Sequence, residues 1–452
     1  MKIYVLLFPI LCLALGLNAQ NEPNWHLLDA EKDGICGTST YRAHKELLSD
    51  KKSEKTIIVA VLDSGVDIEH EDLQGRIWIN KDEIPDNGID DDKNGYIDDV
   101  NGWNFLGNAK GEMVDGDNME FVRMMVALEK KSNLSSEDAA LLKTLKKKYT
   151  EEQTASAQEL EAIQQISSMY ENINGLISTH LNKNDFNKAD VEGIGTTDDK
   201  LALAKKVWLE LEAQGLKEEI IIEAKDYYEA SVNYHLNKDL NTREVIGDDY
   251  TNLKEIGYGN NNVLGGSADH GTHVSGIIAA ISGNNLGADG LADNVLIMPV
   301  RMVPNGDEHD KDVANGIRYA ADNGAHIINM SFGKSYSPYP EAVREAIIYA
   351  GEKGVLMVHG SGNDSSDNDK KPGFPRDAVK GEPNLPYWIE VGASDENIGA
   401  DLLGDFSNYG KKTVDIFAPG VQILSTVPDN KYEKFDGTSM ASPVVALSLI
   451  HI

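Results

Sequence analysis

Short apolar runs separated by polar turns recur in two parts of the chain. Thr56–Leu62 is a run of apolar and β-branched residues, typical of a parallel strand buried on both faces. Similar runs occur at Val295–Val300, His326–Met330, Val355–Val358, Trp388–Val391 and Val414–Phe417. Between them, Asp312–Asp322 and Glu341–Glu352 carry apolar residues at helical spacing. This alternation predicts an α/β fold, in which a mostly parallel sheet has helices on both faces.

The chain between residues 111 and 247 has a different pattern. Apolar residues recur at helical spacing among many Glu and Lys side chains in four segments: Asn118–Lys131, Ser136–Leu181, Asp198–Gln214 and Lys217–Asn237. Gly215 stands where a helix would stop. We predict an all-helical insertion, whose apolar stripes pack among themselves and on the main domain rather than bind a cofactor.

Residues 1–19 have the features of a secretory signal peptide. Lys2 supplies the positive start, Ile3–Leu17 is the apolar core, and Ala19 is a small residue at the expected cleavage point. An N-terminal membrane anchor is the alternative, but the run is short for a bilayer span. We therefore expect an exported protein, periplasmic, surface-bound or extracellular, with no membrane span once the signal is removed.

The composition fits a folded, exported protein. The chain has 452 residues, 41% of them hydrophobic, and 42 Lys and Arg against 74 Asp and Glu give a formal charge of −32. This charge disfavours nucleic acids and anionic membranes as partners. The predicted organisation is a signal peptide (1–19), an N-terminal extension (20–55), a main domain in two parts (56–110 and 248–452) and the helical insertion (111–247) between them.

An acidic segment near residue 90 has the spacing of a calcium-binding loop. Asp90, Asp92, Asn94 and Asp98 supply side-chain oxygens at positions 1, 3, 5 and 9 of the D-x-D-x-N-G pattern. Position 12 is Asn101 rather than the bidentate glutamate of an EF-hand. We therefore predict a Ca²⁺ loop outside any EF-hand, with a solvated acidic turn as the alternative.

Three separate segments place reactive side chains at the ends of predicted elements. Asp63 follows the buried strand, His270 opens a helix of small and apolar residues, and Ser439 opens another helix within Gly437–Pro443. Pro443 is expected in the first turn of that helix, where amides have no intrahelical partner. A serine hydroxyl becomes a useful nucleophile when a base accepts its proton and a third group orients that base. Ser439, His270 and Asp63 can supply these three roles.

The segments around these residues resemble the signatures of a known enzyme family. Val61–Val66, His270–Gly276 and Gly437–Pro443 are similar to the three motifs of subtilisin-like serine peptidases, the S8 family. Their order along the chain, Asp then His then Ser, is that of subtilisin. The resemblance implies a serine endopeptidase acting on polypeptide substrates, with Ser439 as the nucleophile, His270 as the base and then the acid, and Asp63 as its orienting partner.

The resemblance also implies a substrate groove and an oxyanion donor. Asn363 follows the Val355–Val358 strand, where the family places an asparagine that stabilises the developing alkoxide. Ser331-Phe332-Gly333 and Gly360-Ser361-Gly362 would line a groove that pairs with extended substrates through backbone hydrogen bonds. Such pairing implies broad substrate choice.

Two further expectations rest on the resemblance. Asp72 is similar to the family's first calcium aspartate, and Asn284 is similar to a second ligand of that site. The family continues with further helices after the serine helix, whereas the small-residue pattern here ends at Val445. We therefore expect that the peptidase domain is truncated at its C-terminus.

Two functions remain as alternatives to an active peptidase. One is a catalytically silent member of the family, in which the groove binds peptides without cutting them. The other is a calcium-binding surface protein, suggested by the Asp90 loop and the acidic composition. Covalent labelling of Ser439 by a fluorophosphonate distinguishes the first alternative from a peptidase. The second predicts no proteolysis and no effect of Ser439→Ala.

Overall fold

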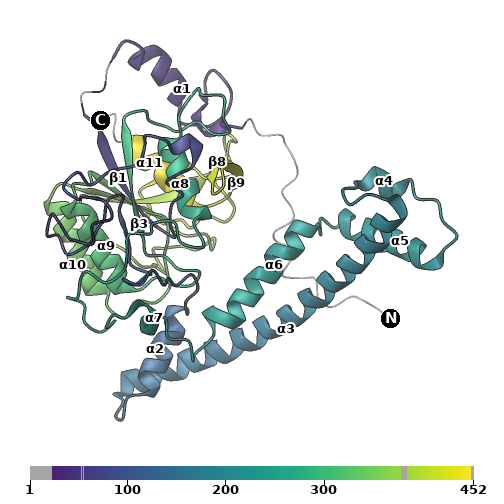
Figure 1. Cartoon of the computed structure of the whole chain (residues 1–452), viewed down its shortest axis with the longest axis horizontal. Coiled ribbons are helices and arrows are strands. Elements are labelled where there is room, and N and C mark those ends of the chain that lie inside the picture. The colour runs from purple at the N-terminus through teal and green to yellow at the C-terminus, as the bar shows by residue number, and fades with distance from the viewer. Residues whose placement is uncertain (1–22, 52, 54, 378–383, 449–452) are drawn as a thin grey trace. The chain divides into compact units, whose positions relative to one another are not determined.

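The computed structural model describes residues 23–448 except 52, 54 and 378–383. The predicted signal peptide and residues 449–452 lie outside the described residues. The described chain forms two compact units (Figure 1). One comprises residues 125–238, and the other comprises residues 23–124 together with 239–448.

A parallel sheet organises the larger unit. Among the described residues it has seven strands, in the spatial order β2 (Trp103–Asn104), β3 (Val295–Arg301), β1 (Ile57–Asp63), β4 (Ile327–Met330), β5 (Leu356–Gly360), β6 (Trp388–Ser394) and β7 (Ile416–Pro419). The predicted α/β fold is confirmed. The sequence pattern missed β2, because two residues are too few for a periodic signal. It also missed an antiparallel hairpin, β8 (Ile423–Val427) with β9 (Lys431–Phe435).

Helices cover both faces of this sheet. Alternate residues of a strand point to opposite faces, and β1 follows this rule: Val59 and Val61 pack into one apolar cluster, Ala60 and Leu62 into the other. The first cluster is completed by α8 (Asp269–Ala279) and α11 (Thr438–Ser448), the second by α9 (Asp310–Asp322) and α10 (Pro340–Glu352). Because β1 is buried on both sides, its carboxyl end is held rigidly.

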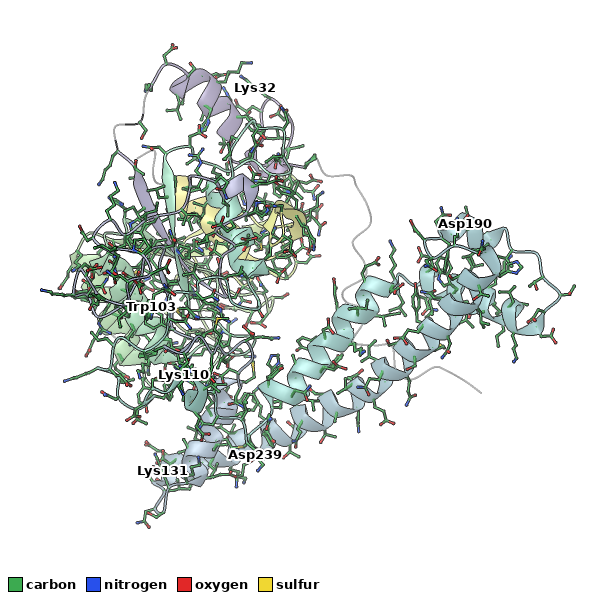
Figure 2. All side chains as sticks on the ribbon, in the orientation of Figure 1. Lys32, Trp103, Lys110, Lys131, Asp190 and Asp239 are labelled. Atoms are coloured by element: carbon green, nitrogen blue, oxygen red, sulfur yellow. The ribbon has the colours of Figure 1, made fainter. Side chains whose placement is uncertain are left out.

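Shorter elements complete the larger unit. They are η2 (Trp25–Leu27), α1 (Thr40–Ala43), η3 (His44–Leu48), η4 (Glu71–Leu73) and α7 (Arg243–Ile246). Trp103 of β2 lies among the crowded side chains of this unit, and its indole Nε1 donates to Tyr258 O at 2.9 Å (Figure 2). Trp25 and Leu27 are fully buried in the same cluster as α11, so the N-terminal extension is part of the core.

The smaller unit is all-helical. Its elements are α3 (Ser136–Leu181), α4 (Lys188–Glu192), α5 (Asp199–Ala213), α6 (Glu218–Ala230) and η5 (Ser231–His235), while α2 (Glu120–Glu129) begins in the larger unit. The bounds of α3 are those predicted from the sequence. Ser135 caps its first turn, accepting a hydrogen bond from Asp138 N at 3.0 Å. Tyr170, Ile177 and Trp208 belong to the apolar core of this unit.

No helix in the described part of the chain has both the length and the apolar character needed to cross a bilayer. Even α3, with 46 residues, carries charged side chains at intervals along most of its length.

Candidate active site

Asp63 is the last residue of β1, at the carboxyl edge of the sheet. Its side chain is 2% exposed. Oδ1 accepts from Ser64 N at 2.7 Å and lies 2.7 Å from His270 Nδ1. The structure therefore brings together two of the predicted catalytic residues, although they are 207 positions apart in the sequence.

Gly271 permits this close approach. A Cβ atom added at Gly271 would lie 2.1 Å from Gly65 O and 3.0 Å from Asp63 Cβ. Any larger residue would therefore push α8 away from the end of β1. The glycine after the histidine allows the imidazole to reach the carboxylate.

The Asp63 carboxylate changes the basicity of His270. Burial alone would lower the pKa of His270, but the negative charge of Asp63 and the hydrogen bond to it outweigh this effect. The pKa is therefore raised above the ordinary histidine value of 6.5. An imidazole held in this way accepts a proton more readily and keeps a fixed orientation.

Ser439 lies in the first turn of α11. Its Oγ donates to Ser331 O at 3.1 Å, and its backbone O accepts from Ser331 Oγ at 2.9 Å. Within the described residues, no hydrogen bond joins Ser439 Oγ to His270. The structure therefore places Ser439 on a helix that packs against α8, but its hydroxyl is hydrogen-bonded to the β4 side of the site.

Pro443 is not in the first turn of α11, contrary to the sequence prediction. It is the sixth residue of the helix, where a backbone N–H would normally donate to the carbonyl of Ser439. Ser331 Oγ supplies the missing donor to that carbonyl. Ser331, which the sequence predicted only as a residue of the groove, therefore also provides the hydrogen-bond donor that Pro443 lacks.

Asn363 lies in the loop after β5 and its amide is oriented by Thr438. Asn363 Oδ1 accepts from Thr438 N at 2.9 Å and from Thr438 Oγ1 at 3.0 Å. A Cβ atom built at Gly437 would lie 3.5 Å from both Asn363 Nδ2 and Ser439 N. The Asn363 Nδ2 group and the Ser439 backbone N–H therefore both lie near Gly437.

The two predicted groove segments extend from neighbouring strands. Ser331-Phe332-Gly333 directly follows β4. Gly360-Ser361-Gly362 begins at the last residue of β5, which pairs with β4. Phe332 O accepts from His359 Nε2 at 2.7 Å. Ser361 N donates to Val391 O at 2.9 Å, and Ser361 O accepts from two asparagine side chains, so both backbone groups of Ser361 are used within the protein. Gly362 N donates to Thr438 Oγ1 at 3.1 Å.

Asp72 and Asn284 are in direct contact. Asp72 is fully buried, and its Oδ1 accepts from Asn284 Nδ2 at 2.6 Å and from Ile281 N at 3.1 Å. Its Oδ2 is buried and has no hydrogen bond of ordinary geometry, although burial and then the charge of Asp72 raise the pKa of the nearby Tyr432 phenol to about 12. An unpaired buried carboxylate oxygen suits a cation. Asn284, however, presents its nitrogen to Asp72, and its oxygen accepts from Leu286 N at 2.9 Å.

The acidic loop gathers only some of its predicted ligands. Oxygens of Glu83, Asp90 and Asp92 lie within 4.8 Å of one another, so this cluster could hold a metal ion. Asn94 donates through its backbone N to Asp90 Oδ1 at 3.0 Å and to Asp92 Oδ1 at 2.9 Å. The Asp98 carboxylate instead accepts from two backbone amides of residues 87 and 88.

Sequence reasoning missed Glu83 and Arg301. Glu83 precedes the loop motif, and no spacing rule includes it. Arg301, 1% exposed at the end of β3, donates to Ser64 O at 2.9 Å and to Asp115 Oδ1 at 2.7 Å. Asp115 Oδ1 also accepts from Gly266 N, in the loop that leads to α8. The available signal for Arg301 was a charged residue directly after the predicted strand Val295–Val300.

Comparison with known proteins agrees with this geometry. Residues 54–452 match the model described as Subtilase family, Peptidase_S8. The chain belongs to the subtilase family. It is similar to the thermophilic serine proteinase of Bacillus sp. (strain AK1), with 41% identity over 39% of this chain and 41% of the relative. Alkaline elastase YaB of Bacillus sp. (strain YaB) is 40% identical over 39% of this chain and 43% of the relative.

Thermitase of Thermoactinomyces vulgaris is a third similar subtilase, 38% identical over 39% of this chain and 58% of the relative. The chain therefore spans about 41 to 58% of the length of these relatives.

Proposed function

We propose that this subtilase is an exported serine endopeptidase that cleaves polypeptides through Ser439, His270 and Asp63. The observation that carries the proposal is the 2.7 Å contact between Asp63 Oδ1 and His270 Nδ1. With Nδ1–H donating to the carboxylate, the tautomer leaves Nε2 as the proton acceptor. His270 then accepts the Ser439 hydroxyl proton as Oγ attacks the scissile carbonyl, and returns it to the leaving amine.

Ser439 must change its hydrogen-bond acceptor for this step. Its Oγ–H donates to Ser331 O, and in the proposed step it would leave this acceptor for His270 Nε2. Hydrogen bonds of a catalytic serine often form only when substrate is bound. The carbonyl of Ser439 is held separately by Ser331 Oγ, so the side chain can turn while the helix stays in place.

Asn363 and Ser439 N supply the proposed oxyanion site. Because Thr438 occupies Asn363 Oδ1 from the protein side, Nδ2 remains to donate to the alkoxide. Donors fixed before the reaction stabilise developing charge without reorganisation.

The substrate is proposed to bind in extended form along the groove. Ser331-Phe332-Gly333 would form one side and Gly360-Ser361-Gly362 the other, since β4 and β5 are adjacent. Because both backbone groups of Ser361 are used internally, the substrate would rely mainly on the first segment for pairing. Recognition through main-chain groups implies broad substrate choice.

Calcium is the proposed structural cofactor. Asp72 Oδ2 fits one ion, because it is a buried and unpaired carboxylate oxygen. Glu83, Asp90 and Asp92 fit another, because hard cations prefer clustered carboxylate oxygens. A bound ion would neutralise repulsion among these carboxylates and so stabilise their loops.

The remaining domain assignments are also proposals. Residues 1–19 would be removed as a signal peptide, and residues 111–247 would be an insertion in a peptidase domain formed by 56–110 and 248–452. The all-helical character of the smaller unit, residues 125–238, supports this division.

Hydrolysis of an unfolded protein tests the proposal. The full chain should cleave reduced, unfolded casein in calcium buffer, and Ser439→Ala should abolish cleavage while leaving the thermal unfolding temperature unchanged. Equal cleavage by Ser439→Ala would refute the proposed nucleophile. A folded wild-type chain that binds casein without cutting it would instead support the catalytically silent alternative.

A further inference from the structure

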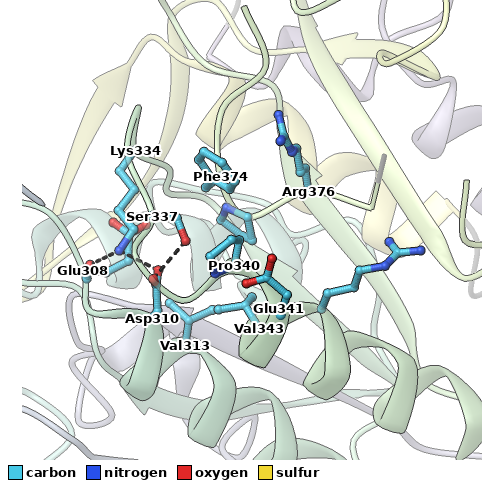
Figure 3. A pocket seen from close by; sticks show the side chains of 12 residues that line it. Glu308, Asp310, Val313, Lys334, Ser337, Pro340, Glu341, Val343, Phe374 and Arg376 are labelled. Carbon is cyan, nitrogen blue, oxygen red and sulfur yellow. Dashed lines mark hydrogen bonds and ion pairs between the residues drawn. The ribbon is translucent and has the colours of Figure 1, made fainter. Parts of the chain in front are cut away.

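Lys334 is a fully ion-paired lysine buried beside the groove. It directly follows Ser331-Phe332-Gly333, and its side chain is 1% exposed. Its Nζ lies 2.8 Å from Glu120 Oε2, 2.6 Å from Glu308 O and 2.8 Å from Asp310 Oδ1. Figure 3 shows the ammonium between Glu308 and Asp310, at the edge of a cavity of about 210 Å³. Glu120 and Glu308 accept hydrogen bonds from the ammonium, and Asp310 forms an ion pair with it.

Glu120, one of these acceptors, begins α2 and is itself held in place. It is 0% exposed, and its backbone N donates to Asp307 Oδ2 at 2.7 Å. Arg123 Nη2 donates to the same Oε2 atom at 2.6 Å. Arg123 also binds the carbonyls of Asp307 and Glu308. Glu120 is thus fixed relative to the loop before α9.

The charges of this pair depend on each other. Burial would raise the pKa of Glu120, but the nearby Arg123 and Lys334 cations outweigh it and lower the pKa to about 2. Burial would lower the pKa of Lys334, but Glu120 and then Asp310 raise it above its ordinary value. Both groups are therefore ionised at neutral pH, and removing one leaves the other buried with part of its charge uncompensated.

A short path connects this pair to the serine. The backbone N and O of Lys334 pair with Phe374 O and N, each at 2.9 Å. Three residues earlier, Ser331 exchanges hydrogen bonds with Ser439. Ser331 is fixed independently by Asn329 Nδ2 at 2.9 Å and Ser442 Oγ at 2.8 Å. Phe332 and Gly333 lie between these two anchors.

We propose that Glu120 is a positioning residue for the substrate groove. Through the Lys334 ammonium it fixes the distal end of the Ser331–Lys334 segment, so that Gly333, which follows the internally bonded Phe332 carbonyl, presents its backbone to an extended substrate. This inference rests on the proposed peptidase function. Glu120 lies in the part of α2 that belongs to the larger unit, and the Ser331–Lys334 segment belongs to the same unit.

Glu120→Gln in the full chain tests the inference, because it keeps the shape and removes the charge. KM for a peptide of eight residues should rise about tenfold, which corresponds to about 1.4 kcal/mol, with kcat changed less than threefold. The rate at which a small fluorophosphonate labels Ser439 should stay within twofold, because this reagent does not occupy the groove and Ser331 keeps its own anchors.

Asp248→Asn is the matched control. Asp248 forms another buried ion pair, in which its Oδ2 lies 2.5 Å from Lys311 Nζ. This ion pair does not contact the Ser331–Lys334 segment. Asp248→Asn should lower the unfolding temperature without raising KM. If Asp248→Asn raises KM as much as Glu120→Gln does, the effect is general destabilisation and the inference is wrong.

A double-mutant cycle provides the second test, and it remains informative if Glu120→Gln is unstable. Lys334→Met replaces the ammonium with a neutral chain of similar length and should raise KM to a similar degree. Adding Glu120→Gln to Lys334→Met should then change KM less than twofold, whereas a full tenfold further rise would overturn the inference.

Absence of Ser439 labelling in the folded wild type would count against the proposed function. Unchanged KM in a Glu120→Gln chain whose Ser439 is labelled would count against this inference alone.

Discussion

At the residue scale, the contact between Asp63 and His270 determines the charge of the proposed base. The carboxylate raises the pKa of His270 because it stabilises the imidazolium. The neutral imidazole is the form that accepts a proton from Ser439. The proposed activity should therefore be absent well below the pKa of His270 and appear as the pH rises through it.

The pH profile of kcat/KM should show this dependence. In the wild type, the acid limb should have a midpoint above 6.5, because the pKa of His270 is raised from that value. Asp63→Asn should lower kcat about 10⁴-fold, as loss of the orienting carboxylate does in serine peptidases, and should shift the midpoint to lower pH. A wild-type midpoint below 6.5, or one unmoved by Asp63→Asn, would contradict the assignment.

Asn363→Ala should lower kcat about 100- to 1,000-fold with little change in KM, a loss known from the equivalent change in subtilisin. The reason is that Asn363 Nδ2 and Ser439 N both flank Gly437, and the variant removes one of these donors. Steady-state kinetics with a peptide substrate provide the measurement. Asn172→Ala, at an exposed position of α3, is the control and should be neutral. A rise in KM with unchanged kcat would show that Asn363 binds substrate instead.

At the element scale, α8 must lie close to the end of β1. Gly271→Ala should reduce kcat/KM more than 100-fold, because the new Cβ would lie 2.1 Å from Gly65 O and would push His270 away from Asp63. Such overpacking should also lower the free energy of unfolding by about 1–3 kcal/mol.

Gly175→Ala in α3 is the matched control for that change. It is also a helical glycine, but a Cβ there meets nothing within 4 Å. It should stabilise α3 by about 0.5–1 kcal/mol and leave activity unchanged. Denaturant unfolding and kinetics on both variants make the comparison, and equal effects at Gly175 and Gly271 would show that packing against Gly65 is unimportant.

The main elements were predictable because their signals are local. The β-branched run of β1 and the capping serine of α3 each act within a few residues, and the structure has both elements as predicted. Pro443 shows the limit of local signals. Within α11 the proline leaves the Ser439 carbonyl without its usual donor, and Ser331 Oγ replaces that donor. Ser331 is 111 positions before Ser442, the residue next to Pro443, so the sequence around the proline gives no sign of this hydrogen bond.

At the scale of the whole molecule, the acidic loops should make stability depend on calcium. A saturating ligand at 100 times its Kd stabilises a folded protein by about 2.7 kcal/mol per site. Thermal unfolding in CaCl₂ and in excess chelator should therefore differ by several degrees, with the chelated protein less stable. Part of this difference should be lost in Asp92→Asn, because Asp92 contributes to the Glu83, Asp90 and Asp92 cluster.

Asp185→Asn removes an exposed carboxylate of the helical unit and is the control for that experiment. It should keep the full calcium response. An unfolding temperature independent of calcium in the wild type would refute both proposed ion sites, and an unchanged response in Asp92→Asn would refute the site in the loop.

Long-range polar contacts were the part of the molecule that the sequence could not predict. Glu120, Glu308 and Lys334 are charged residues with no local pattern, so each would ordinarily be placed on the surface. They are buried because elements from distant parts of the chain converge on them. The candidate triad was predictable from the sequence because its motifs resemble those of a family, whereas no motif surrounds the residues of this network.

Mapping a covalent adduct on the full chain is the most direct test of the central claim, that Ser439 is a nucleophile activated by His270 and Asp63. After treatment with a fluorophosphonate at pH 8, mass spectrometry of the digested protein should find one adduct per chain, on Ser439. His270→Ala should lose this adduct while remaining folded. Two results would contradict the account: an adduct on another residue, or an active chain in which Ser439 stays unmodified after complete reaction with the fluorophosphonate.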